Sequence, residues 1–162
     1  MNKPTRNVLH IERWLLLVFT ALLVGCGGSA PSPTDADVQK LTLQICDELI
    51  RDQLILVEGP NNTGMTVDAM QRYNGIAPKY AVWNEMKDQH EGIKAAVEAI
   101  DQTMSTLDLS LSAIRVLSKD DDTKRTEFAA QLQLGNGKNL NIQGSAQYTE
   151  DGQVYVEVAL LE

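Results

Sequence analysis

The spacing of apolar residues divides the chain into a helical first part and a stranded last part. From Val38 the apolar positions recur every three or four residues, as they do on one face of a helix. We therefore predict a first helix over about 37–56, and Thr34 and Asp37 have the spacing of a capping box at its start. The breaker-rich stretch 58–64 is expected to be a loop.

Two further helices are predicted before the strands begin. Thr66 is placed to cap a short helix that ends at about Tyr73. A longer helix is expected over about 79–104, and its apolar stripe includes His90. A histidine in such a stripe is expected to be a core or boundary residue rather than a catalytic base. The alternative is a ligand pocket that His90 lines together with Tyr73, Tyr80 and Trp83, although aromatic residues at such positions more often belong to a core.

After Leu107 the apolar period changes to two, which is typical of half-buried strands. The first strand carries a phase shift that indicates a bulge near Ser112. The glycine-rich turns 135–137 and 151–152 separate three more alternating stretches, at 128–134, 139–148 and 154–160. The predicted fold class is therefore α+β, with two or three helices packed on a curved four-stranded antiparallel meander.

The first 25 residues follow a different pattern. Lys3, Arg6 and Arg13 precede an apolar run of eleven residues, 14–24, and small residues follow. A helix needs roughly 20 apolar residues to span a bilayer, so this run is too short for a permanent span. A basic start, a short apolar middle and small residues at the cut site are typical of a removable export leader.

The run ends in Leu23-Val24-Gly25-Cys26, which resembles the lipobox of bacterial lipoproteins. The resemblance implies that Cys26 is linked to diacylglycerol, becomes the first residue after cleavage and is then N-acylated. Two acyl chains are enough for a stable membrane anchor. Because the next residue is Gly27 and not Asp, the resemblance also implies the outer membrane, facing the periplasm, in a gram-negative host. In a gram-positive host it implies the outer face of the cell membrane.

These features define three expected regions. Residues 1–25 are a lipoprotein signal peptide, and residues 26–37 are the lipidated cysteine and a flexible tether rich in Gly, Ser and Pro. Residues 38–162 form a single globular domain. The expected localisation is the cell envelope, with the membrane as a partner through the lipid on Cys26.

Charge and composition exclude several functions. The leader holds three of the 14 basic and one of the 22 acidic residues, so its removal takes the formal charge from −8 to −10. Such a surface repels phosphate backbones, and we expect no nucleic-acid partner. The negative charge could suit a basic protein partner or merely keep the domain soluble. Cys46 has no possible disulfide partner within the mature chain and is expected to be a buried, inert thiol.

The mature sequence offers few groups for catalysis. The run Asp120-Asp121-Asp122 lacks the spacing of an EF-hand and is interpreted as a solvated loop tip, so no metal site is expected. Phosphate-binding glycine loops, GxSxG and HExxH motifs and Cys or His ligand pairs are also absent from the sequence. We therefore expect no cofactor and no enzyme of the metallo- or serine-hydrolase type.

The order of elements over residues 38–162 resembles the cystatin-like α+β architecture, in particular the nuclear-transport-factor-like group. The closest local likeness is 113–158, where a strand, a charged loop and two hairpins end in Asp151-Gly152-Gln153-Val154-Tyr155. A second resemblance, to the small outer-membrane assembly lipoproteins, rests on Gly64-Met65-Thr66 with Gly75 and Pro78. In that family strands follow promptly, whereas a long helix is expected here, so this resemblance ranks behind the first. The first resemblance implies either a binding domain or an isomerase-like pocket.

Three functional hypotheses follow from these observations. The first is a non-enzymatic binding or adaptor domain that recognises another envelope protein, of which an immunity-type lipoprotein is one form. The second is a small-molecule binder or isomerase-like enzyme with a pocket around Tyr73, Trp83 and His90. This second hypothesis needs a carboxylate of raised pKa in an apolar cavity, a role that the sequence alone assigns to no residue. The third is a structural component of an envelope complex.

Overall fold

The computed structural model of the chain describes residues 19–21, 28–74 and 78–161. It begins with the short strand β1 and continues with four α-helices, a 3-10 helix and a run of four strands. The elements are β1 (Phe19–Ala21), α1 (Ala36–Thr63), α2 (Val67–Asn74), α3 (Tyr80–Met86), η1 (Lys87–Gln89), α4 (Glu91–Ser105), β2 (Ser110–Asp120), β3 (Arg125–Gln133), β4 (Asn139–Tyr148) and β5 (Val154–Leu161). The α+β fold class with an antiparallel meander is therefore confirmed, with four α-helices where two or three were predicted.

The sheet has the order β1-β5-β4-β3-β2, and every neighbouring pair is antiparallel. The two predicted glycine turns connect β3 to β4 and β4 to β5, with Gly137 at φ 84° and Gly152 at φ 79°. The expected bulge is also present, since the β2–β3 register shifts between Ser112 and Arg115 and Ala113 has φ 50°. A second shift follows between Val116 and Ser118. Local turn chemistry and alternation thus determine the stranded part.

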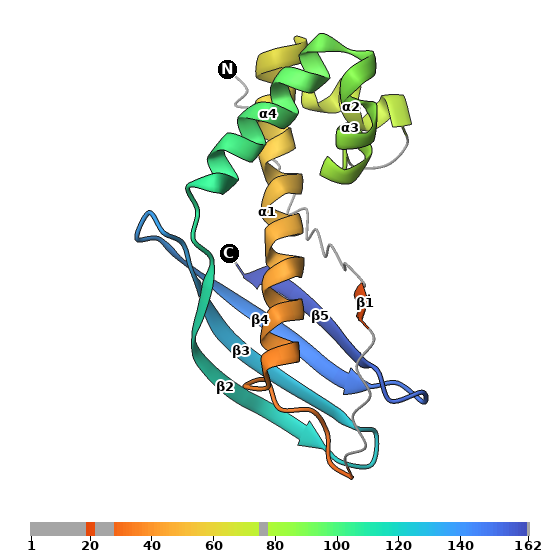
Figure 1. Cartoon of the computed structure of the whole chain (residues 1–162), viewed down its shortest axis with the longest axis vertical. Coiled ribbons are helices and arrows are strands. Elements are labelled where there is room, and N and C mark those ends of the chain that lie inside the picture. Colours follow the sequence, from red (N-terminus) through yellow and green to blue (C-terminus); the bar gives the residue numbers. More distant parts are fainter. Residues whose placement is uncertain (1–18, 22–27, 75–77, 162) are drawn as a thin grey trace, which may run out of the picture.

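The first part of the long helix α1 lies over the sheet, and its last part lies among the other helices (Figure 1). It therefore contributes to two separate cores. Its first half covers the sheet, where Phe128 and Ile142 are fully buried beneath Val38, Leu41 and Ile45. Its second half packs against α2, α3 and α4 in a core that includes Ile55, Met70, Trp83, Ile93, Ala96, Val97, Ile100 and Met104. The helices α2 to α4 therefore gather around one end of α1, and we call this group the helical cap.

The predicted loop over 58–64 is wrong, because α1 continues as a helix to Thr63 with Pro60 inside it. The helix continues because a tertiary contact forms there. A Cβ atom on Gly59 would lie 2.9 Å from Trp83 Cη2, so the missing side chain lets α3 approach α1 closely. The helix ends at Gly64, whose φ is 71° and whose N–H donates to Pro60 O at 3.0 Å.

The predicted capping box of α1 is also wrong. The N-cap is Asp35, in an extended conformation, and no side chain caps the helix. The Asp35 carboxylate instead accepts a hydrogen bond from Ser32 N at 2.9 Å, on the side of the preceding segment. By contrast, Thr66 caps α2 as expected, because its Oγ1 accepts a hydrogen bond from Ala69 N at 3.2 Å.

The single helix predicted over 79–104 is divided into α3, η1 and α4. His90 breaks it, with φ −146° and ψ 120°, and is the N-cap of α4. The break lets α3 and α4 pack side by side, so that Trp83 of α3 and Ile100 of α4 both reach the second core. Gly92 makes the approach of α4 to α1 possible, because a Cβ atom there would lie 2.8 Å from Asn62 O.

Candidate functional site

The residues proposed for a pocket do not share one environment. Trp83 is buried in the second core, and only 4% of its surface is exposed. His90 is exposed at the start of α4, so the prediction that it lies in a buried apolar stripe is wrong. The reason is the break at His90, which turns this position out of the helical stripe. The backbone of Tyr73 belongs to α2, but its side chain and the whole of Cys26 lie outside the described residues.

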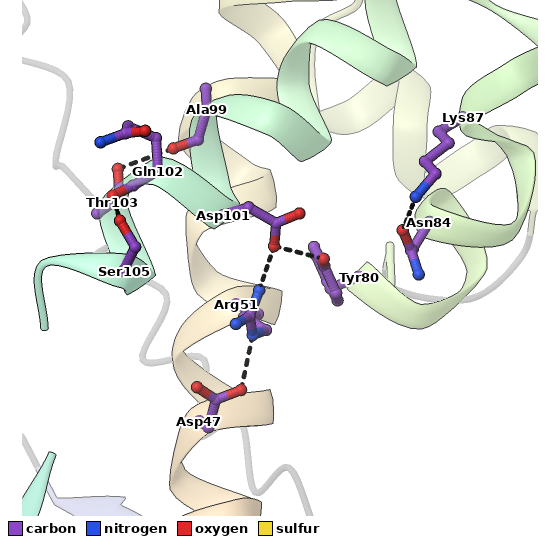
Figure 2. A network of polar contacts seen from close by, with 10 residues as sticks. All are labelled: Asp47, Arg51, Tyr80, Asn84, Lys87, Ala99, Asp101, Gln102, Thr103 and Ser105. Carbon is purple, nitrogen blue, oxygen red and sulfur yellow. Dashed lines mark hydrogen bonds and ion pairs between the residues drawn. The ribbon is translucent and has the colours of Figure 1, made fainter. Parts of the chain in front are cut away.

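The structure instead brings together a polar network between α1, α3 and α4 (Figure 2). Arg51 is its centre: Nε donates to Asp47 at 2.6 Å and Nη1 donates to Asp101 at 2.6 Å. The Tyr80 hydroxyl donates to the same Asp101 oxygen at 2.6 Å. The Arg51 guanidinium also lies over the Tyr80 ring, 4.8 Å from its centroid, which adds a cation–π contact.

A second ion pair is formed by the next residue of α1, Asp52. Asp52 is only 8% exposed, and its carboxylate accepts hydrogen bonds from Lys79 Nζ at 2.7 Å and from Tyr80 N at 2.8 Å. The buried charge is therefore compensated by a cation and by the first backbone amide of α3. Together the two clusters fasten α3 and α4 to α1.

The pKa shifts in this network agree with a structural role. Burial, and then the hydrogen bond to Asp101, raise the pKa of Tyr80 to about 12. Burial alone would raise the pKa of Asp101, but the hydrogen bonds from Tyr80 and Arg51 outweigh it and the pKa is lowered. An acid that stays ionised and a tyrosine that stays protonated suit a fixed ion pair better than proton transfer at neutral pH.

Glu48 is the carboxylate that comes nearest to the group required by the enzyme hypothesis. Burial, followed by the neighbouring charges of Asp52 and Asp47, raises its pKa. It lies on α1 eleven residues before Gly59, the residue that Trp83 contacts, so about three helical turns separate Glu48 from that tryptophan. The carboxylate with the raised pKa, Glu48, and the buried Trp83 therefore do not line one pocket.

The segment that precedes α1 is in contact with the sheet. Ala30, Pro31 and Pro33 are buried, although this stretch was expected to belong to a flexible tether. Ala30 N donates to Asp121 Oδ1 at 2.8 Å, and Lys124 Nζ donates to Gly28 O. The docked segment, residues 28–33, therefore joins the folded domain at the turn between β2 and β3.

The acidic run at this turn makes local hydrogen bonds. Asp120 Oδ1 accepts from the backbone N–H groups of Asp122 and Thr123, at 2.9 and 3.2 Å, and Asp121 holds the docked segment. These residues are exposed, as predicted for a loop tip. Across the described ranges of the chain, no group of three or more His, Cys, Asp or Glu side chains is placed to hold a metal ion.

The two outer strands of the meander differ in how their edges are protected. β2 carries two register shifts, a positive φ at Ala113 and a charged end, all of which hinder pairing with another strand. β5 pairs with β4 over eight consecutive positions without a shift, and it contains neither proline nor lysine. Its other edge pairs with β1, with Phe19 opposite Val156 and Ala21 opposite Val154.

Cys46 is buried, as predicted, and burial raises the pKa of its thiol to about 12. Among the residues with a described position, no helix is both long and apolar enough to cross a membrane.

Comparison with family models, with curated proteins and with solved structures gave no match to this chain. The sequence motif at Cys26 and the geometry of the domain are therefore the two indications of function.

Proposed function

We propose that the protein is a bacterial envelope lipoprotein, anchored through lipid on Cys26, whose domain binds another envelope protein without catalysis. The leader pattern and the residues Leu23–Cys26 support the anchor. A gram-negative host would place it on the outer membrane, facing the periplasm. The hydrogen bonds that join Arg51, Asp47, Asp101 and Tyr80 support a structural use of the charged groups between the helices.

One observation carries the binding proposal: the outer edge of β5 accepts a strand. In this chain the strand is β1, residues Phe19–Ala21, which belong to the leader that we expect to be removed. Cleavage before Cys26 would leave the backbone N–H and C=O groups of that edge without a strand. An edge strand with regular pairing and unpaired backbone groups can pair with a strand from another protein.

The chemistry of β5 indicates what kind of segment fits. Val154, Val156 and Val158 are buried toward α1, while Tyr155 and Glu157 alternate on the opposite face. Glu157 is the one charged residue of the strand, and it accepts a hydrogen bond from the Tyr155 hydroxyl at 3.0 Å. An antiparallel segment with apolar residues on its inner face fits this edge, and the acidic remainder of the surface favours a basic partner.

The first experiment tests the anchor and the binding mode in cells. Acylation is tested by fatty-acid labelling of the native chain and of Cys26→Ser, in which label and membrane retention should be lost. A photo-crosslinking residue is then placed at Leu161 on β5 or at Val82 on α3, since both side chains are 43% exposed. We expect protein adducts at 161 and not at 82.

Hydrogen exchange then distinguishes strand addition from mere proximity. In the isolated complex, the amides of Val154–Leu161 should exchange more slowly than in the free protein, because an added strand pairs with that edge. Adducts at Val82 alone, with unchanged exchange along β5, would show that the partner binds the helical cap and would refute strand addition.

A further inference from the structure

We propose that the end of the domain formed by the docked segment and the β2–β3 turn lies directly on the lipid surface, with the helical cap pointing away from it. This inference depends on the proposed acylation of Cys26. It adds an orientation and a second membrane contact, neither of which the anchor alone would require.

Only a few residues separate Cys26 from the folded domain. Ala30 lies four residues after Cys26. It is already buried, and its backbone N–H donates a hydrogen bond to the Asp121 carboxylate. Four extended residues reach at most about 14 Å. A second contact, from Lys124 to the carbonyl of Gly28, fastens the chain even nearer to the acylated residue. The β2–β3 turn therefore cannot move far from the headgroups.

Two exposed apolar residues lie at the same end of the sheet. Val116 and Leu117 are consecutive residues of β2, yet 53% and 47% of their surfaces are exposed. The register shift between Val116 and Ser118 accounts for this, because alternation fails at a bulge. The pair lies four to five residues before Asp121, the residue that holds the docked segment. Apolar side chains so close to a lipid anchor fit the boundary between headgroups and acyl chains.

The charges around this pair also fit a lipid surface. Arg115, Lys119, Lys124 and Arg125 flank the turn, so four cations accompany the three aspartates of 120–122. Lys119 Nζ is 3.3 Å from Asp121 Oδ1, and the Asp120 carboxylate accepts a hydrogen bond from the backbone N–H of Asp122 in the same turn. Arg125 lies 3.9 Å from Glu127 and 3.8 Å from Glu157, so cations and acids nearly balance at this end of the domain. This balance contrasts with the acidic chain as a whole, and it makes this end less repulsive to anionic headgroups than the rest of the surface.

The helix α1 runs from the docked segment to the helical cap (Figure 1). The helix starts directly after the docked segment, and its 28 residues extend about 42 Å. Gly92 at the start of α4 approaches Asn62 near the other end of α1, so the helical cap lies far from the β2–β3 turn (Figure 1). If the turn lies on the lipid, the cap is in the aqueous space and the β5 edge remains accessible from the side.

The orientation is tested with the acylated full chain in vesicles of phosphatidylethanolamine and phosphatidylglycerol that contain a headgroup spin label. A fluorophore is attached at Thr123→Cys or at Gln89→Cys, two exposed, uncharged positions at opposite ends of the domain. Cys46 is buried and its thiol has a pKa of about 12, so it does not compete for the label. We expect the label at 123 to lose most of its fluorescence and the label at 89 to lose almost none.

Two variants test the cause. A flexible insertion between Cys26 and Gly28 should abolish the difference in quenching, because it removes the short reach. Leu117→Ser should weaken quenching at 123 while acylation is retained. Equal quenching at both positions in the acylated protein would overturn the orientation. Absence of fatty acid on Cys26 would instead refute the proposed function, so the two failures are distinguishable.

Discussion

Gly59 lets α1 and α3 approach each other, and Gly59→Ala tests this contact. A Cβ atom at residue 59 would lie 2.8 Å from Met70 Sδ and 2.9 Å from Trp83 Cη2. Both partners are nearly fully buried, with exposures of 3% and 4%, so neither can turn away into solvent. Overpacking of this kind typically costs about 1–3 kcal/mol. The higher helix propensity of Ala returns only about 1 kcal/mol.

We therefore expect Gly59→Ala to lower the free energy of unfolding by about 1 kcal/mol, where helix propensity alone predicts a rise. The assay is urea unfolding of the chain from Gly28 onward, followed by far-UV circular dichroism. With a slope of about 2 kcal/mol per M, the midpoint should fall by roughly 0.5 M. Trp83 is the single tryptophan of that protein, and its fluorescence provides an independent signal from the contact itself.

A double-mutant cycle identifies the cause. Phe lacks the outer ring atom that the new methyl group would meet, so Trp83→Phe should relieve the part of the clash that involves residue 83, while the close approach to Met70 Sδ remains. In that background Gly59→Ala is expected to destabilise the fold less than it does in the native chain. The reasoning would be refuted if the alanine stabilised the native background, or if its effect were the same in both backgrounds.

Three further predictions concern other parts of the domain. Phe128→Ala removes a side chain that is 1% exposed beneath α1, and urea unfolding should show a loss of about 3–5 kcal/mol. The Cys46 thiol, with a pKa of about 12, should not react with an aromatic disulfide reagent near neutral pH until urea unfolds the protein. Folding lowers the pKa of Asp101, so its carboxylate stabilises the fold at pH values above its unfolded pKa of about 4. This stabilisation is lost as the pH falls through the lower pKa of the folded state. The Asp101 side chain is 49% exposed, so the free energy of unfolding obtained from urea titration should be lower in Asp101→Asn than in the native chain by less than about 1 kcal/mol near neutral pH. The two free energies should converge in acid.

The strands could be predicted because their signals are local. The glycine turns at 135–137 and 151–152 determine two hairpins, and alternation determines which residues face the core. The helices were predicted less well at two places, each of which depends on contacts between distant residues. Propensity favours a loop at 58–64, but packing of Gly59 against Trp83 continues the helix. The apolar period runs through His90, yet the chain breaks there.

The same distinction explains what was missed around the candidate sites. Asp47 and Arg51 have the i, i+4 spacing of a helical ion pair, and this part of the network could have been found from the sequence. Asp101 lies fifty residues further on, and nothing local pairs it with Arg51. The contact between Ala30 and Asp121 spans 91 residues. The stretch 28–33 has the composition of a linker, so only the folded sheet shows that it is docked.

The two proposals constrain each other through α1. Its first half packs on the sheet and its second half forms the core of the helical cap, so sheet and cap share one continuous helix. Arg51 and Asp52 fasten α3 and α4 to that helix from its middle turns. A domain fastened in this way should have one orientation, and fixing the β2–β3 turn at the lipid would also fix the height of the β5 edge. A partner segment would then reach the β5 edge from the side, along the membrane plane. A partner that contacted only the helical cap would not reach this edge.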